Sequence, residues 1–179
     1  ENIDAGTMGR VVAIDATGTG DVTATHERWR ADEMAVGFSS PLVHDGRVYV
    51  IDNSANLFAL DASNGTVEWE QSVGTVGKAS PVWADDKLFV TETNGNVTIL
   101  EPGDNGATQL DHDELQMVTE NRYAEIYGSF AIGYGRLYVT SEAGIYCIGN
   151  PGANFTASAS ADVDLGAETA ATDTAAVLQ

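Results

Sequence analysis

The chain has 179 residues, with 27 acidic residues against eight Lys and Arg, and its formal net charge is -19. Such an acidic surface repels a phosphate backbone, which argues against nucleic-acid binding. No apolar run approaches the roughly 18 residues that a membrane-spanning helix needs. The single cysteine, Cys147, excludes an intrachain disulfide. The length allows one ordinary domain or part of a larger one.

The first predicted elements are a strand at residues 10–15 and, after a long hairpin connection at 17–25, a second strand that contains Trp29. The first of these strands returns along the chain as an apolar run that ends in an acidic residue or Gly. Its copies are residues 56–61, 96–101 and 144–149. The repeat therefore begins partway through its unit.

Two further repeated elements precede each of the later copies. One is a strand start that contains Ser, at residues 39–43, 79–83 and 128–132. Pro41 and Pro81 fit there, because a strand start does not need the missing amide donor. The other is a turn residue, a basic residue and an apolar-aromatic-apolar strand, at residues 46–50, 86–90 and 135–139.

The best-defined copy of the unit ends in a hairpin that runs from Ala59 to Trp69. Leu57, Ala59, Val67 and Trp69 fall at a period of two, which predicts that they share one face of the sheet. Asn64-Gly65 between the two strands indicates a tight turn of type I′ or a related type.

A unit of about 40 residues with four short strands is typical of a propeller blade. The predicted fold class is all-β, a β-propeller of four-stranded antiparallel blades, incomplete and with about three blades present. Residues 1–150 are predicted to hold these repeats, and residues 151–179 a disordered linker rich in Ala, Thr and Asp. Within the repeats we expect a half blade at 10–31, blades at 37–71 and 78–111, and a partial blade at 127–148.

The pattern Ala59-x-Asp61-x-x-Asn64-Gly65-x-x-x-Trp69 resembles the tryptophan-docking motif of pyrroloquinoline quinone (PQQ)-like repeats, with Asn64 in place of the usual Thr. In that family the Trp of one blade packs against the next blade. The resemblance implies a structural docking motif of Ala59, Asp61, Gly65 and Trp69, with Trp29 in the same role. The third copy has Glu101 and Leu110 at the Asp and Trp positions.

This repeat occurs in quinoprotein dehydrogenases and in the propeller lipoprotein of the outer-membrane barrel assembly machinery. A dehydrogenase implies PQQ, a calcium ion, an Asp general base and often a disulfide of adjacent cysteines. One cysteine cannot form that disulfide, and the acidic run 111–114 is interpreted as solvated charge in a connection. We therefore predict no catalytic, cofactor-binding or metal-binding residue in this chain.

The expected function is a non-catalytic scaffold or protein-interaction module of a larger bacterial protein. The resemblance places that protein outside the cytoplasm, in the periplasm, at the cell surface or secreted. Expected partners are the remaining blades of its own propeller and a protein that binds the loop rim. The alternative is a fragment of a PQQ-dependent alcohol or sugar dehydrogenase whose cofactor residues lie outside this chain.

Two other residue sets allow either a structural or a functional interpretation. The histidines His26, His44 and His112 are scattered, without metal-ligand spacing, and surface or edge positions are favoured. A second set of aromatics recurs at matched positions, where packing between blades is favoured over a stacking ring for a sugar or quinone. Its members are Tyr49, Phe89 and Tyr138.

Overall fold

The computed structural model describes residues 9–115, 117–119 and 122–149, and these residues form strands, turns and loops without a helix. The linker predicted at 151–179 lies outside the described residues. The strands are β1 (Arg10–Ile14), β2 (Glu27–Asp32), β3 (Leu42–His44), β4 (Arg47–Ile51), β5 (Asn56–Asp61), β6 (Val67–Ser72), β7 (Val82–Ala84), β8 (Lys87–Thr91), β9 (Asn96–Pro102), β10 (Ala107–Glu114), β11 (Met117–Thr119), β12 (Arg122–Tyr123), β13 (Ala131–Gly133), β14 (Arg136–Ser141) and β15 (Gly144–Ile148). The prediction of an all-β chain is confirmed for the described residues.

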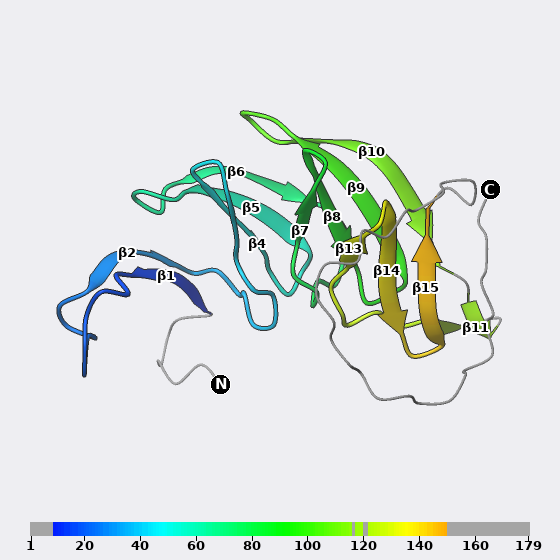
Figure 1. Ribbon diagram of the computed structural model, residues 1–179, viewed down its shortest axis with the longest axis horizontal. Coiled ribbons are helices and arrows are strands. Elements are labelled where there is room, and N and C mark those ends of the chain that lie inside the picture. Colours follow the sequence, from blue (N-terminus) through cyan, green and yellow to red (C-terminus); the bar gives the residue numbers. More distant parts are fainter. Residues whose placement is uncertain (1–8, 116, 120–121, 150–179) are drawn as a thin grey trace.

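The strands form four successive sheets, in which neighbouring strands pair antiparallel. Sheet 1 is β1–β2, sheet 2 is β3–β4–β5–β6, sheet 3 is β7–β8–β9–β10 and sheet 4 is β13–β14–β15. A short ribbon, β11–β12, lies in the connection from sheet 3 to sheet 4. Figure 1 shows the sheets following one another from the blue β1–β2 pair to the orange β15.

Sheets 2 and 3 each pack against a neighbouring sheet on both faces. Successive side chains of a strand point to opposite faces, so they reach different neighbours. In β4, Val48 and Val50 pack with residues of sheet 1, whereas Tyr49 and Ile51 pack with residues of sheet 3. This explains why the strand is apolar at every position from Val48 to Ile51 rather than alternating. We call the face toward the preceding sheet the rear face and the face toward the following sheet the forward face.

Three apolar clusters fill the spaces between successive sheets. The cluster between sheets 1 and 2 includes Val11 and Trp29, and the cluster between sheets 2 and 3 includes Trp69 and Leu100. The cluster between sheets 3 and 4 includes Phe89 and Val139. The core is therefore a series of interfaces between successive sheets.

The loop between β5 and β6, from Asp61 to Thr66, is longer than a two-residue type I′ turn. Gly65 has φ 77, but Asn64 does not have a positive φ, so a type I′ turn is wrong here. The Asp61 carboxylate accepts a hydrogen bond from Ser63 N at 2.7 Å, and Gly65 N donates to Asp61 O at 2.8 Å. This Asx turn lengthens the loop, because the Asp side chain competes for the backbone amides.

Two further expectations about strands are wrong. Val67 does not share the face of Ala59 and Trp69, because a bulge between Ala59 and Leu60 pairs Val67 with Leu60 and leaves it 42% exposed. The acidic run 111–114 does not lie in a loop, because β10 continues to Glu114. There His112 Nδ1 contacts Thr98 Oγ1 at 2.9 Å.

Candidate functional site

Trp29 joins sheet 1 to the β5–β6 loop of sheet 2. Its indole Nε1 donates a hydrogen bond to Ala62 O at 2.8 Å. Its ring lies against Gly65, where an added Cβ would come within 2.4 Å of Trp29 Cε3. Gly65 is therefore required both for its left-handed backbone and for the close approach of the ring. The Asx turn of Asp61 orders this β5–β6 loop, which accepts the hydrogen bond from Trp29.

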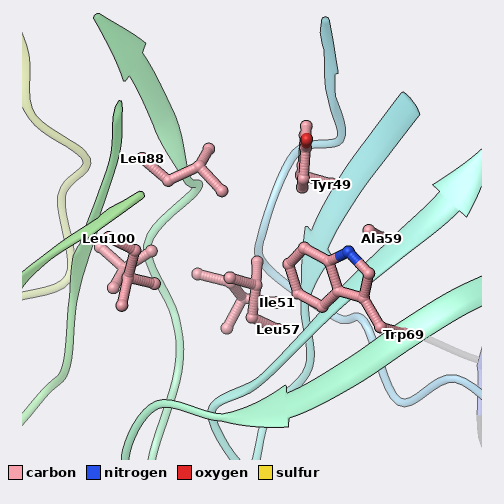
Figure 2. Packing of buried hydrophobic residues seen from close by; sticks show 8 residues of the cluster. Tyr49, Ile51, Leu57, Ala59, Trp69, Leu88 and Leu100 are labelled. Carbon is pink, nitrogen blue, oxygen red and sulfur yellow. The ribbon is translucent and has the colours of Figure 1, made fainter. Parts of the chain in front are cut away.

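Trp69 makes the corresponding contact from sheet 2 to sheet 3. Its ring is 6% exposed, Ala59 is its cross-strand partner, and its Nε1 donates to Gly103 O at 3.2 Å. Figure 2 shows the indole beside Tyr49 and Ala59, with Leu88 and Leu100 of sheet 3 facing the same cluster. The residues predicted as a docking motif thus lie on both sides of successive interfaces.

Two side chains of sheet 2 that the sequence interpretation missed also reach the backbone of sheet 3. Arg47 Nη1 donates to Gly103 O at 3.2 Å, and its guanidinium lies 3.6 Å from the Asp104 carboxylate. Gln71 Oε1 accepts a hydrogen bond from Ala107 N at 2.8 Å. The sequence shows that a basic residue recurs at the position of Arg47. Residue types alone do not show that its guanidinium binds a backbone carbonyl of sheet 3.

The interface between sheets 3 and 4 contains no tryptophan, and other residues fill it. Leu110 is at the Trp position of the sequence motif, but a bulge in β10 pairs Asp111 with Ile99 in the register in which Trp69 pairs with Ala59. An acidic residue therefore takes the Trp position of sheet 3, and Leu110 is 46% exposed. Three buried residues of the connection fill the cluster instead: Leu115, Ile126 and Phe130. The Phe130 ring meets Phe89 edge-on at 6.1 Å between centroids. The long connection therefore stabilises the interface that lacks an indole.

A relay of serines links the segments that precede β3, β7 and β13, the first strands of sheets 2, 3 and 4. Ser40 N donates to Ser80 Oγ at 2.8 Å, and Ser80 N donates to Ser129 Oγ at 2.8 Å. The three residues occupy equivalent positions of the repeat. The relay has a direction, because each sheet accepts from the sheet before it.

The loops that connect successive sheets form one continuous hydrogen-bonded rim. In sheets 2, 3 and 4 the turn after the second strand donates to the preceding connection: Asn53 N to Ala35 O at 3.0 Å, Thr93 N to Val76 O at 3.1 Å and Glu142 N to Glu125 O at 3.1 Å. Buried Asp52 and Glu92 hold two of these turns through Asn56 N and Asn96 Nδ2. We call these connections and turns the loop rim.

The loop rim presents exposed aromatic residues at matched positions. Phe38 and Tyr127 both stand two residues before a relay serine and are among the most exposed large apolar side chains. Lys78 occupies the same position between them, and its Nζ lies 4.0 Å from the centre of the Phe38 ring. At the opposite ends of the strands the turns are acidic, and they include Asp45, Asp61, Asp85, Asp86 and Asp104.

Short-range hydrogen bonds dominate the electrostatics of the acidic turns. The Thr17 hydroxyl and amide, with a smaller contribution from Arg28, lower the pKa of Asp15 to about 2. Ser63 in the same way lowers the pKa of Asp61. Both carboxylates are therefore charged acceptors that order loops, and neither has the raised pKa of a general acid.

The described part of the chain shows no cluster of metal-binding side chains. Among residues 9–115, 117–119 and 122–149, no three His, Cys, Asp or Glu side chains lie together in a way that could hold a metal ion. His44 instead stacks on Trp83, with ring centroids 3.9 Å apart. That part of the chain also contains no helix able to cross a membrane.

Successive antiparallel sheets that pack face to face through their repeats define a β-propeller section. The family model described as outer membrane protein assembly factor BamB matches residues 4–161. The chain therefore belongs to this family of PQQ-like repeat propellers, as the docking motif predicted. No curated protein matches the sequence.

Solved structures with the same fold include BamB from Moraxella catarrhalis, with a TM-score of 0.58 and 23% identity over 75% of this chain and 38% of that chain. Quinohemoprotein alcohol dehydrogenase ADHIIG from Pseudomonas putida HK5 gives a TM-score of 0.52 and 17% identity, covering 60% of this chain and 17% of that one. A europium-containing methanol dehydrogenase gives 0.54 and 12%, covering 74% and 31%. The predicted incomplete propeller is confirmed, and the chain spans well under half the length of these relatives.

Proposed function

We propose that this chain is a non-catalytic section of a propeller that serves as a scaffold and binds a protein partner through the loop rim. Further blades of the same repeat complete the ring, and the whole protein acts outside the cytoplasm, as the family match to an outer membrane assembly factor suggests. The observation that carries the proposal is the rim itself. Exposed Phe38 and Tyr127 lie there on loops that backbone hydrogen bonds to the neighbouring turns hold in place.

Aromatic residues on a rigid support are suited to recognition of a protein. They offer large apolar contact area with few rotatable bonds, and such residues dominate the binding energy of many interfaces. Lys78 beside Phe38 adds one positive charge to an otherwise acidic chain. A partner segment with apolar and acidic side chains would match this combination.

The test uses a random peptide library displayed on phage, panned against the 179-residue chain. Enriched peptides should lose at least about tenfold in affinity, or about 1.4 kcal/mol, when Phe38→Glu or Tyr127→Glu is introduced. The matched control is Val67→Glu, which adds the same charge at an exposed apolar residue of β6 away from the rim. Equal binding to all three variants would refute the rim as the binding surface.

The second candidate is a fragment of a PQQ-dependent dehydrogenase, which the folds of a quinohemoprotein alcohol dehydrogenase and a methanol dehydrogenase keep open. Among the described residues, no three His, Cys, Asp or Glu side chains lie together in a way that could hold a metal ion. We expect no quinone absorbance to co-elute with the chain after incubation with PQQ and calcium, and dye reduction with alcohols at the background rate. Calcium-dependent PQQ binding would overturn the non-catalytic assignment.

A further inference from the structure

Asn-Gly pairs occur in three turns of sheets 2 and 3. They are Asn64-Gly65 in the β5–β6 loop, Asn94-Gly95 in the β8–β9 turn and Asn105-Gly106 in the β9–β10 turn. In such a pair the backbone nitrogen of the Gly can approach Cγ of the Asn, because the Gly has no Cβ to obstruct it. Each pair is therefore a candidate for spontaneous loss of the Asn side-chain amide.

The reaction is a ring closure followed by hydrolysis. The Gly amide loses its proton, and its nitrogen attacks Cγ of the Asn to form a new C–N bond. The bond from Cγ to the side-chain nitrogen breaks, and that nitrogen leaves as ammonia with the added proton. Water then opens the cyclic imide at either carbonyl, which gives Asp or isoaspartate. The reaction therefore needs only water, a free Gly amide and a mobile Asn side chain.

Hydrogen bonds restrain the pair in the β5–β6 loop. Gly65 N donates to Asp61 O at 2.8 Å, so this nitrogen must first leave its acceptor. Asn64 Oδ1 accepts a hydrogen bond from Thr66 N at 2.8 Å, which fixes the side chain that would be attacked. Reaction at Asn64 therefore requires local opening of the loop.

The pair in the β8–β9 turn is restrained in the same way. Gly95 N donates to Glu92 O at 3.2 Å, and Asn94 Oδ1 accepts from Asn96 N at 3.3 Å. The buried Glu92 carboxylate also accepts from Thr75 Oγ1 at 3.2 Å, in the connection before sheet 3. Opening of this turn therefore also disturbs a contact with the preceding connection.

The pair Asn105-Gly106 has neither restraint. Asn105 is exposed, and no hydrogen bond to another described residue holds its side chain or the Gly106 amide. Sheet 3 has Glu101 where sheet 2 has Asp61. Asx turns are formed by Asp and Asn, so the third copy of the docking motif lacks the residue that orders the loop in sheet 2.

The β9–β10 turn is also where side chains of sheet 2 contact sheet 3. Gly103 O accepts hydrogen bonds from Trp69 Nε1 and from Arg47 Nη1, both at 3.2 Å. Ala107 N donates to Gln71 Oε1 at 2.8 Å. The unrestrained Asn-Gly pair therefore lies between two points at which sheet 2 is held.

Isoaspartate at this position changes the length of the backbone. The chain then runs through the former side-chain carbons, which adds a carbon atom between residues 105 and 106. At present Gly103 N donates to Gly106 O at 2.7 Å and closes the turn. The added atom alters the spacing of these two groups and displaces Ala107 from its acceptor.

We propose that Asn105 is a site of spontaneous deamidation, and that its isoaspartate product weakens the contact between sheets 2 and 3. The product also adds a negative charge beside Asp104, in a chain of formal charge -19. Released ammonia does not return to the side chain, so the modified fraction increases with the age of the protein. The substrate of this modification is the chain itself, and water is the only co-reactant.

Incubation of the purified chain in mildly alkaline buffer, followed by peptide mapping with mass spectrometry, measures the rate at each site. In the folded chain we expect Asn105 to react at least about fivefold faster than Asn64 or Asn94, which react only after local opening. In urea the three rates should become similar. Asp61→Ala, which removes the carboxylate that orders the β5–β6 loop, should raise the rate at Asn64 toward that at Asn105.

Hydrogen exchange in the isolated isoaspartate form measures the effect on the contact. The Ala107 amide and the Trp69 indole N–H should exchange at least about threefold faster than in the unmodified chain. Freshly prepared Asn105→Asp adds the same charge without the extra backbone atom, and Asn105→Gln keeps an amide that does not form this ring. Both variants should exchange like the unmodified chain.

Three results would overturn the proposal. Equal rates at the three sites of the folded chain would show that the hydrogen bonds do not select Asn105. Unchanged exchange in the isoaspartate form would show that the contact does not depend on the length of this turn. Equally fast exchange in Asn105→Asp would assign the effect to charge. None of these results affects the peptide experiment on the loop rim, which does not involve Asn105.

Discussion

Replacement of Trp69 by Ala tests whether an indole holds sheets 2 and 3 together. The side chain is 6% exposed and packs with Tyr49, Leu88 and Leu100. Removal of a buried Trp from a core costs about 3 to 5 kcal/mol, through lost burial and the remaining cavity. The lost hydrogen bond should add little, because Arg47 also donates to the carbonyl of Gly103 at 3.2 Å.

Urea unfolding followed by circular dichroism measures this cost without relying on tryptophan fluorescence. Trp69→Phe keeps an aromatic ring and loses only the N–H donor and part of the volume, so we expect about 1 to 2 kcal/mol. Leu110→Ala is the control at an exposed apolar residue of β10 in sheet 3. That side chain is 46% exposed, and its truncation should change the free energy of unfolding by less than about 0.5 kcal/mol.

Amide exchange locates the effect of Trp69→Ala. Protection should fall first in β8 and β9, which face the indole, and later in β14, which is held by the separate cluster of Phe89 and Val139. A cost below about 1 kcal/mol, or equal loss of protection in β9 and β14, would mean that Trp69 does not act as the contact between these sheets.

Other predictions concern the turns and the serine relay. Gly65→Ala should destabilise the chain by at least about 1 kcal/mol more than Gly46→Ala in urea unfolding, because both have φ 77 but an added Cβ meets atoms within 4 Å only at Gly65. Ser80→Ala should speed exchange of the Ser40 amide, which loses its acceptor, by about threefold or more. Asp15 has a folded pKa of about 2, below its ordinary 3.8, so the stability it contributes is present above about pH 4 and is lost as the pH falls toward 2. Asp15→Asn should remove this part of the pH dependence of unfolding, and an unchanged profile would contradict it.

The repeat was predictable from the sequence because one contiguous segment of the chain encodes each blade. Strand β4 is apolar at every position from Val48 to Ile51, which indicates burial on both faces. Regular recurrence of that strand then requires a series of stacked sheets rather than one. The all-β propeller prediction succeeded for this reason, and the family match agrees with it.

The contacts that join sheets were less predictable, because most of them end on backbone atoms. A basic residue recurs at Arg47, Lys87 and Arg136, yet the three side chains reach different targets. Arg47 donates to a carbonyl of the next sheet, Lys87 to Asp85 in its own turn and Arg136 to the sulfur of Cys147. Residue type alone does not distinguish these cases, because the target depends on the loop that happens to lie within reach.

The direction of the contacts explains why the connection before sheet 4 is long. Trp29 and Trp69 each reach forward to a loop of the next sheet, and the serines follow the same direction. Sheet 3 has no indole to continue this series, so its forward face needs another cover. Leu115 and Ile126, 1% and 0% exposed, provide it from within the connection. The long connection between sheets 3 and 4 therefore has a structural role in this chain.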